Sequence, residues 1–212
     1  MMIYELHFAS THIFPLSFML DVFTISNSFK VVSFHGSDLP QFTPSDRDYW
    51  LKVVDDLGAK SAKAQHLPRP ITTSEKLLRT AQHHRVYIAL EGFKPIGLGK
   101  VGKKRIFHLS EDNDTVEHLT CQCLLDFYIQ EDFQRHGYGR LLMDAMIKID
   151  PHLHGLNDLG IDRPSEACLS FFEKNYSLEP VRVGIDHDFC VFSDGALSSS
   201  PYQTSHGNVA TL

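Results

Sequence analysis

Residues 134–140, QRHGYGR, have the types and spacing that suit the binding of a phosphate group. Gly137 and Gly139 allow a tight turn in which backbone N–H groups can approach a ligand without obstruction by side chains. A helix that begins near Gly139 directs its free N–H groups and the positive end of its dipole toward that turn. Arg135 and Arg140 add two charged donors, so the turn either binds a phosphate or merely connects a strand to a helix. It is neither a Walker A loop nor a complete GxGxxG motif.

The cysteines and histidines do not have the spacing of a metal site. The four cysteines, at positions 121, 123, 168 and 190, follow no CxxC pattern, and the histidine pairs at 83–84 and 152–154 lack a third ligand at a suitable spacing. Cys121 and Cys123 should point to one face of a strand, which suits packing better than a disulfide. We therefore expect no metal, and reduced thiols in a cytosolic compartment.

The glycine turn must be positioned by a strand before it and a helix after it. Apolar runs bounded by turn residues predict five strands, over residues 85–90, 96–109, 117–129, 159–162 and 188–194. Apolar residues at helical spacing predict four helices, over residues 43–67, 72–82, 139–149 and 165–176. The first three strands follow one another through turns, the second of them at the polar run 110–115, which indicates an antiparallel meander.

Polar residues at the predicted helix starts have the spacing of N-terminal caps. Ser45 with Asp48 and Thr72 with Glu75 have the spacing of capping boxes for the first two helices, and Ser165 is the expected cap of the last. The resulting order of elements predicts an α/β fold, a mixed and mostly antiparallel sheet flanked by helices.

Composition limits the classes of partner. The 212 residues suffice for one domain, and the net charge of −6 argues against broad nucleic-acid binding. A local cluster of basic residues either faces an acidic partner or is the solvated end of a hairpin, and consists of Lys100, Lys103, Lys104 and Arg105. The apolar stretch 11–25 is too short for a membrane span and lacks the flanks of a signal peptide, so we expect no membrane contact.

Four segments together resemble the α-tubulin N-acetyltransferase family of acetyl-CoA-dependent N-acetyltransferases. Residues 134–139 fit the Q/R-x-x-G-x-G/A signature of the superfamily, and CLLDFYIQEDFQRHGYGR, LGAKSAKAQHLPRPIT, GKVGKKRIF and GIDRPS resemble the narrower family. The resemblance implies a single-domain N-acetyltransferase fold over residues 45–194. We expect a poorly defined leader over residues 1–44 and a flexible tail over 195–212.

The resemblance also implies two segments that bind acetyl-CoA as co-substrate, both at helix N-termini, where N–H donors can reach the diphosphate and the pantetheine arm. The first segment comprises Phe127, Tyr128, Ile129, Gln130, Glu131, Asp132, Phe133, Gln134, Arg135, His136, Gly137, Tyr138, Gly139 and Arg140. The second segment comprises Ser165, Glu166, Ala167, Cys168, Leu169, Ser170, Phe171, Phe172, Glu173 and Lys174.

Acetyl transfer to lysine requires a neutral amine, so a base or a pocket that lowers the lysine pKa is needed. The resemblance assigns catalytic positions to Gln65, Cys123 and Asp162, with Asp162 as base or as the group that orients the lysine ammonium. Without the resemblance, Cys123 would be interpreted as a buried strand residue and Asp162 as a turn residue. Direct attack by the lysine is expected, without a covalent acetyl-cysteine. Asp126 and Tyr128 are expected to alternate away from Cys123, with hydrogen bonding as the role of Asp126.

The resemblance implies acetylation of a lysine of α-tubulin on microtubules, hence a monomeric cytoplasmic enzyme at the cytoskeleton, in cilia or axonemes among other places. Two alternatives remain open: an acetyltransferase of the same fold that acts on another protein or a small amine, and a microtubule-binding protein without activity. The complete turn at 134–139 and the IDRPS motif argue against the second alternative. The connection 150–159, DPHLHGLNDL, is longer than expected for the family, which could displace Asp162.

Overall fold

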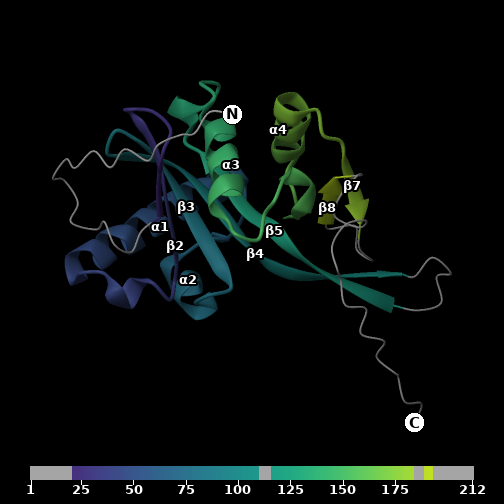
Figure 1. The fold of residues 1–212 in the computed structure, drawn as a ribbon, viewed down its shortest axis with the longest axis horizontal. Coiled ribbons are helices and arrows are strands. Elements are labelled where there is room, and N and C mark those ends of the chain that lie inside the picture. Colours follow the sequence, from purple (N-terminus) through teal and green to yellow (C-terminus); the bar gives the residue numbers. More distant parts are fainter. Residues whose placement is uncertain (1–20, 110–115, 184–188, 193–212) are drawn as a thin grey trace, which may run out of the picture.

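The three predicted meander strands form the middle of one sheet in the computed structural model, which describes residues 21–109, 116–183 and 189–192 (Figure 1). The strands are β1 (Asp21–Thr24), β2 (Phe29–His35), β3 (His84–Glu91), β4 (Lys94–Leu109), β5 (Val116–Ile129), β6 (Leu159–Asp162), β7 (Pro180–Val183) and β8 (Phe189–Phe192). Their order in the sheet is β1-β2-β3-β4-β5-β6-β8-β7. Only the β5–β6 pair is parallel among these strands, so the sheet is mixed and mostly antiparallel, as predicted.

The helices cover both faces of the sheet. One face carries α1 (Pro44–Ala64) and α2 (Ser74–Thr80), and the other carries α3 (Tyr138–Ile149) and α4 (Glu166–Tyr176) (Figure 1). Two hydrophobic clusters correspond to these faces, one around Trp50 and Leu57 of α1 and one around Met146 of α3 and Phe172 of α4. The predicted α/β fold class is confirmed.

The first two helices begin at different caps from those predicted. Thr43, rather than Ser45, caps α1, because its side chain accepts a hydrogen bond from the N–H of Asp46. Thr73, rather than Thr72, caps α2 in the same way. Ser165 caps α4 as predicted, with its side chain accepting from the N–H of Cys168 at 3.2 Å. The change at α2 leaves the Thr72 hydroxyl available for another contact.

The expected domain boundary at residue 45 is too late, since β1 and β2 belong to the sheet. β2 pairs with β3 along its length, and its side chains are buried on both faces. Phe29 and Val31 pack in the α3–α4 cluster, whereas Val32 and Phe34 pack in the α1 cluster. A strand buried on both sides lacks the alternation that identifies a half-exposed strand, so the sequence pattern does not reveal it. Residues 1–20 and the predicted tail, 195–212, lie outside the described residues.

A β-bulge changes the direction of side chains near the end of β5. Lys100 of β4 lies opposite Asp126, but the next residue, Val101, lies opposite Leu124, so Leu125 is an extra residue on β5. Asp126 therefore faces α1, on the same side of the sheet as Cys123. The expectation that Asp126 and Tyr128 alternate away from Cys123 is wrong, because strict alternation fails at a bulge.

The parallel strands β5 and β6 separate soon after they meet. Gln122, Cys123 and Leu124 pair with the first three residues of β6. Beyond Leu124, the end of β5 pairs only with β4 within the described part of the chain. Because the two strands are parallel, their carboxyl ends lie at one edge of the sheet, where α3 follows β5 and α4 follows β6. Ligands commonly bind at the carboxyl ends of strands in α/β proteins.

Candidate functional site

The glycine turn has the open backbone geometry that phosphate binding requires. Arg135 and Gly137 both adopt left-handed conformations, with φ of 65° and 84°. Gly137 is the N-cap residue of α3, and no described side chain caps this end of the helix. The first helical hydrogen bond runs from the N–H of Leu141 to the carbonyl of Gly137 at 3.1 Å, so the N–H groups of the first turn have no intrahelical acceptor. A methyl group on Gly137 would meet no described heavy atom within 4 Å, so the space beside the turn is open.

The two predicted cofactor segments lie against each other. The rings of Phe127 and Phe171 are 5.1 Å apart between centroids, and a methyl group on Gly139 would lie 3.1 Å from Phe171. The hydroxyl of Tyr176 donates to the carboxylate of Asp144 at 2.8 Å, and this contact also joins α4 to α3. The end of β5, the start of α3 and one face of α4 thus border one region, and the open turn within it fits a diphosphate.

Some side chains of these segments point away from that region. Phe172 is fully buried and packs 4.9 Å from Phe192, measured between ring centroids. Tyr128 packs in the α1 cluster on the other face of the sheet, and its hydroxyl donates to Glu131 at 2.8 Å. Ile129 lies in the core. These residues can contribute to a ligand site only through their backbone or by positioning others.

Asp162 lies at the end of β6 in a small pocket on the α1–α2 face of the sheet. Its carboxylate forms an ion pair with the ammonium of Lys104 at 3.0 Å, and its side chain is 17% exposed. The pocket has a volume of about 220 Å³ and is lined by Ile71, Lys76, Thr80, His84, Lys100, Lys104, Leu125 and Asp162. This is smaller than the ~300–1,000 Å³ of pockets that hold drug-sized ligands, so the pocket suits a single side chain.

Two titratable groups in this pocket have strongly lowered pKa values. Burial lowers the pKa of Lys100 to about 8, although the nearby charge of Asp126 raises it in part. Burial also lowers the pKa of His84 to about 4, and the positive charges of Lys100 and Lys104 add to the effect. Both shifts favour the neutral form, so the pocket disfavours additional positive charge except beside Asp162.

Cys123 is a buried and neutral thiol. Its sulfur lies 3.3 Å from that of Cys121, and a methyl group on Gly160 would come within 2.9 Å of it. The hydrogen bond with Cys121 and burial both raise the pKa of the Cys123 thiol. A thiol with a raised pKa is a poor nucleophile, because the thiolate is the reactive form. Gly160 precedes Asp162 by two residues, so Cys123 and Asp162 lie on the same face of the sheet.

Gln65 follows the last residue of α1 and reaches the same face of the sheet. Its side-chain N–H₂ group donates to Ser61 at 2.8 Å and to Asp126 at 3.3 Å. Asp126 also accepts hydrogen bonds from the hydroxyls of Ser61 and Thr72. Asp126 thus connects Gln65 of the α1 end to the pocket. Two of the pocket residues are its neighbours in the sheet: Lys100 lies opposite it on β4, and Leu125 precedes it on β5.

Ser61 and Thr72 are not among the predicted site residues. Ser61 is a polar residue among the apolar inner positions of α1, and such a position signals a buried hydrogen bond. Thr72 has the sequence spacing of a helix cap, so the sequence pattern favours a capping role over its hydrogen bond to Asp126. In both cases the partner, Asp126, is distant in sequence and takes its orientation from the bulge.

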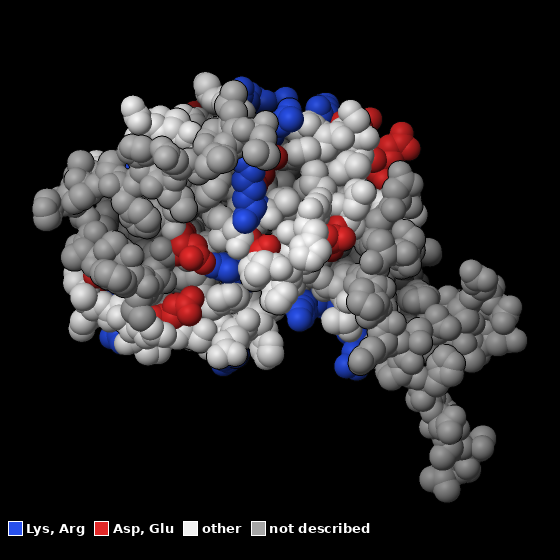
Figure 2. All heavy atoms as spheres, viewed as in Figure 1, with Lys and Arg blue, Asp and Glu red and all other residues white. Residues whose placement is uncertain are grey.

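The predicted basic cluster is divided between environments. Lys103 and Arg105 are exposed, whereas Lys100 is buried and Lys104 pairs with Asp162. Alternation along β4 separates them, because consecutive side chains point to opposite faces. Among the residues that the structure describes, Figure 2 shows basic and acidic side chains interspersed on the face in view.

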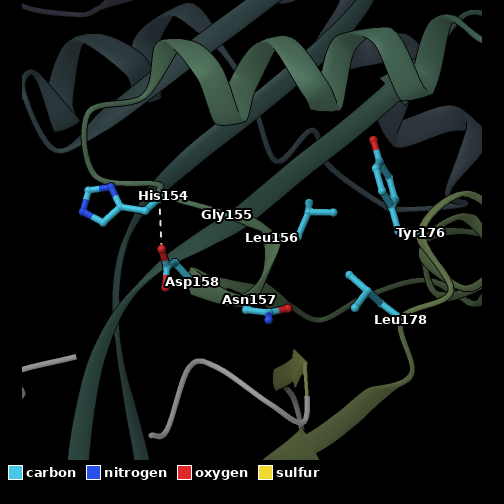
Figure 3. Close-up of a pocket in the computed structure, with 7 residues that line it drawn as sticks. All are labelled: His154, Gly155, Leu156, Asn157, Asp158, Tyr176 and Leu178. Carbon is cyan, nitrogen blue, oxygen red and sulfur yellow. Dashed lines mark hydrogen bonds between the residues drawn. The ribbon is translucent and has the colours of Figure 1, made fainter. Parts of the chain in front are cut away.

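A larger hollow of about 410 Å³ lies along the connection between α3 and β6 (Figure 3). It is lined by His154, Gly155, Leu156, Asn157, Asp158, Tyr176 and Leu178, none of them a predicted site residue. The N–H of His154 donates to Asp158 at 3.0 Å, as drawn in Figure 3. The connection is anchored by buried Asp150, which accepts a hydrogen bond from the hydroxyl of Tyr87 at 2.7 Å.

Two further classes of feature are absent from the described residues. They contain no group of three or more His, Cys, Asp or Glu side chains placed to hold a metal ion. Within the same residues, no helix is long and apolar enough to cross a membrane.

Comparison with known proteins identifies relatives of the chain. Over 131 residues it is 40% identical to the α-tubulin N-acetyltransferase of Aedes aegypti, a match that covers 60% of this chain and 46% of the relative. Over 182 residues it is 40% identical to α-tubulin N-acetyltransferase 1 of Danio rerio, covering 80% of this chain and 55% of the relative. The chain therefore spans about half the length of these two relatives.

The fold and the family model agree with these relatives. The acetyltransferase domain of xEco2, solved with a CoA conjugate, superposes with a TM-score of 0.51 at 12% identity over 73% of this chain and 91% of that one. A likeness at this identity concerns the fold alone, and it confirms the predicted N-acetyltransferase fold. The family model described as "GNAT acetyltransferase, Mec-17" matches residues 20–208, which confirms the predicted family. This chain belongs to the Mec-17 family of GNAT acetyltransferases.

Proposed function

We propose that the chain transfers the acetyl group of acetyl-CoA to a lysine side chain of α-tubulin on microtubules. The names of its relatives support the substrate, and membership of an acetyltransferase family supports the acetyl donor. The observation that carries the proposal is the pocket at the end of β6. There a carboxylate, Asp162, binds the ammonium group of a lysine, Lys104, in a space that suits one side chain.

Acetyl-CoA, the acetyl donor, would bind on the α3–α4 face, where β5 and β6 have separated. Backbone N–H groups at the start of α3, with Arg135 and Arg140, would hold its diphosphate. Phe127 and Phe171 would border the pantetheine arm, and α4 would supply the N–H groups of its first turn. Acetyl-CoA would supply an acetyl thioester at the end of β5, where β5 has parted from β6.

The chain's own residues would prepare the lysine for attack. An incoming ammonium group would replace Lys104 beside Asp162, which would then accept the proton that the amine must lose. The lowered pKa values of Lys100 and His84 reflect a pocket that favours neutral nitrogen groups, and this also favours the neutral amine. Gln65 would contribute an amide beside the amine. Cys123, neutral and enclosed, would shape the site without forming a covalent intermediate. The amine would attack the acetyl carbon directly in a ternary complex; the carbon–sulfur bond of the thioester would break, and CoA would leave as the thiol after taking up a proton.

A protein with this function would act at the cytoskeleton, on microtubules that would include those of cilia and axonemes. Binding to tubulin would rely on the substrate-side face, which carries the pocket and the basic residues at its rim. One chain contains both the turn and the pocket, so a monomer would suffice.

The decisive experiment compares amine acceptors. Purified chain and acetyl-CoA are incubated with polymerised α/β-tubulin, with unpolymerised tubulin, with free polyamines and with unrelated lysine peptides. We expect acetylation of a tubulin lysine, read by mass spectrometry, at a higher kcat/KM than of the other amines. Acetylation of polyamines or unrelated peptides with none on tubulin would contradict the proposed substrate. Binding to microtubules without transfer to any acceptor would point instead to an inactive binding protein.

A further inference from the structure

The carboxylate of Asp126 accepts hydrogen bonds from side chains of α1, of its C-cap and of the segment before α2. Ser61 donates its hydroxyl proton to Oδ1 at 2.7 Å, and Thr72 donates to Oδ2 at the same distance. Gln65 donates from Nε2 to Oδ1 at 3.3 Å. Asp126, Ser61 and Thr72 are all buried. Both hydroxyls donate to the carboxylate, which therefore acts as the acceptor in this network.

This arrangement determines which way the Gln65 amide faces. An ionised carboxylate can only accept hydrogen bonds, so the end of the amide beside Asp126 must be the N–H₂ group. The second N–H donates to the oxygen of Ser61 at 2.8 Å. Ser61 has given its own proton to Asp126, so toward Gln65 it can act only as an acceptor. Both donors of the amide are therefore occupied, and a flip would place its oxygen against two acceptors.

We infer that Asp126 is a positioning residue that holds the Gln65 amide with its carbonyl oxygen directed to the reacting amine. The inference rests on the proposed function. Among the described residues no donor is assigned to this oxygen, and Gln65 is the partly exposed member of the network. The oxygen can accept an N–H of the incoming lysine and so direct the nitrogen lone pair toward the acetyl carbon. The opposite orientation would present donors to the lysine, which the positively charged ammonium cannot use.

A buried network could also serve stability alone, and two matched substitutions separate the roles. Ser61→Ala and Thr72→Val each remove one 2.7 Å hydrogen bond to Asp126, but only Ser61 also contacts Gln65. With the full chain, acetyl-CoA and tubulin, we expect Ser61→Ala to lower kcat/KM roughly 10-fold and Thr72→Val to leave it within about twofold. The melting temperature should fall in both variants. Equal kcat/KM values for both variants would overturn the inference.

An exchange of charge between Asp126 and Gln65 provides a test by rescue. Gln65→Glu places a carboxylate against Asp126 and should lower kcat/KM by roughly 100-fold or more. Adding Asp126→Asn gives the network an amide donor where the carboxylate of Asp126 was, so that the new carboxylate at position 65 can accept from it and again present an oxygen to the lysine. The double variant should recover at least about tenfold in kcat/KM over Gln65→Glu. Failure to recover, in a double variant that folds, would overturn the inference.

A spectroscopic measurement tests the network without any substrate. In an ¹H–¹⁵N spectrum of the wild-type chain, the side-chain N–H₂ signals of Gln65, assigned through Gln65→Met, should exchange slowly with solvent. They should exchange faster in Ser61→Ala and at an unchanged rate in Thr72→Val. Rapid exchange in the wild type would overturn the inference, whatever amine the enzyme acetylates. Absence of transfer to tubulin by the wild type, with slow exchange intact, would count against the proposed substrate only.

Discussion

The carboxylate of Asp162 lies 3.0 Å from the ammonium group of Lys104, so the chain places one of its own lysines at the residue proposed to receive a substrate lysine. Lys104 is 40% exposed and pairs across from β4 to the end of β6. A partly exposed ion pair of this kind is worth about 0.2–1 kcal/mol, which a substrate ammonium can readily offset. In the proposed mechanism Lys104 would therefore compete with the substrate lysine for Asp162 without closing the site.

Replacing Lys104 with Met should lower the KM for a short lysine peptide by roughly two- to fivefold, because the competing ammonium is removed. The value of kcat should change little. Lys103→Met is the matched control, since Lys103 is an exposed neighbour on the opposite face of β4 and should leave KM unchanged. Initial rates over a range of peptide concentrations measure both constants. A higher KM for Lys104→Met would mean that Lys104 assists substrate binding.

Replacing Asp162 with Asn should lower kcat by roughly 10²- to 10⁴-fold, the usual contribution of a general base. Affinity for acetyl-CoA, measured by calorimetry, should be retained, because Asp162 lies on the α1–α2 face and the glycine turn lies beyond the end of β5. Stability should change by less than about 1 kcal/mol, since the lost ion pair is partly exposed. Turnover at the wild-type rate would exclude Asp162 as the base.

Replacing Gly137 with Ala should raise the KM for acetyl-CoA on the order of tenfold, because the left-handed turn and its close approach to phosphate are disturbed. Strain alone should cost about 1 kcal/mol of stability. Gly92→Ala controls for strain, since Gly92 also has a positive φ, of 60°, and open space where a methyl group would lie, but belongs to the turn between β3 and β4. Similar KM values for acetyl-CoA in the two variants would show that the glycine turn does not bind acetyl-CoA.

Incubation of the wild-type chain with acetyl-CoA alone should leave Cys123 without an acetyl group, because its pKa is raised and the thiolate is scarce. Rapid quenching at low pH followed by peptide mass spectrometry measures this directly. Double-reciprocal plots against both substrates should intersect, as in a ternary complex, whereas parallel lines would indicate a covalent intermediate.

The free energy of unfolding should fall as the pH drops from about 6.5 toward 4, in part through His84. The pKa of His84 is lowered from 6.5 to about 4 in the folded chain, mainly by burial. Between these values the unfolded chain binds a proton that the folded chain excludes, so protons favour unfolding. Urea denaturation at several pH values should show a shallower decline for His84→Gln than for the wild type. Identical declines would show that His84 titrates normally in the folded chain.

Much of the site could be predicted because its motifs are local. The glycine turn, the Ser165 cap and the end of β6 each depend on a few consecutive residues, and all lie as expected. The network around Asp126 could not be predicted, because it joins residues up to 65 positions apart. Thr72 and Thr73 are equally suited to cap α2, and the choice between them follows from the contact of Thr72 with Asp126. β2 could not be predicted for a different reason: burial on both faces removes the alternation that marks a strand.

The bulge at Leu125 makes the distance between the motifs as important as the motifs themselves. Cys123, before the bulge, faces the α1–α2 side of the sheet, where the lysine is proposed to bind. Phe127, after the bulge, faces α4, and the glycine turn where acetyl-CoA is proposed to bind follows it. Without the bulge, regular pairing of the same residues with β4 would exchange the faces of the strand end and turn Phe127 toward α1 and Tyr128 toward α3 and α4. A relative with one residue fewer between Cys123 and Phe127 would be expected to reach the same faces by regular alternation, without a bulge. Sequences of this family are best compared by counting residues along β5 as well as by matching them.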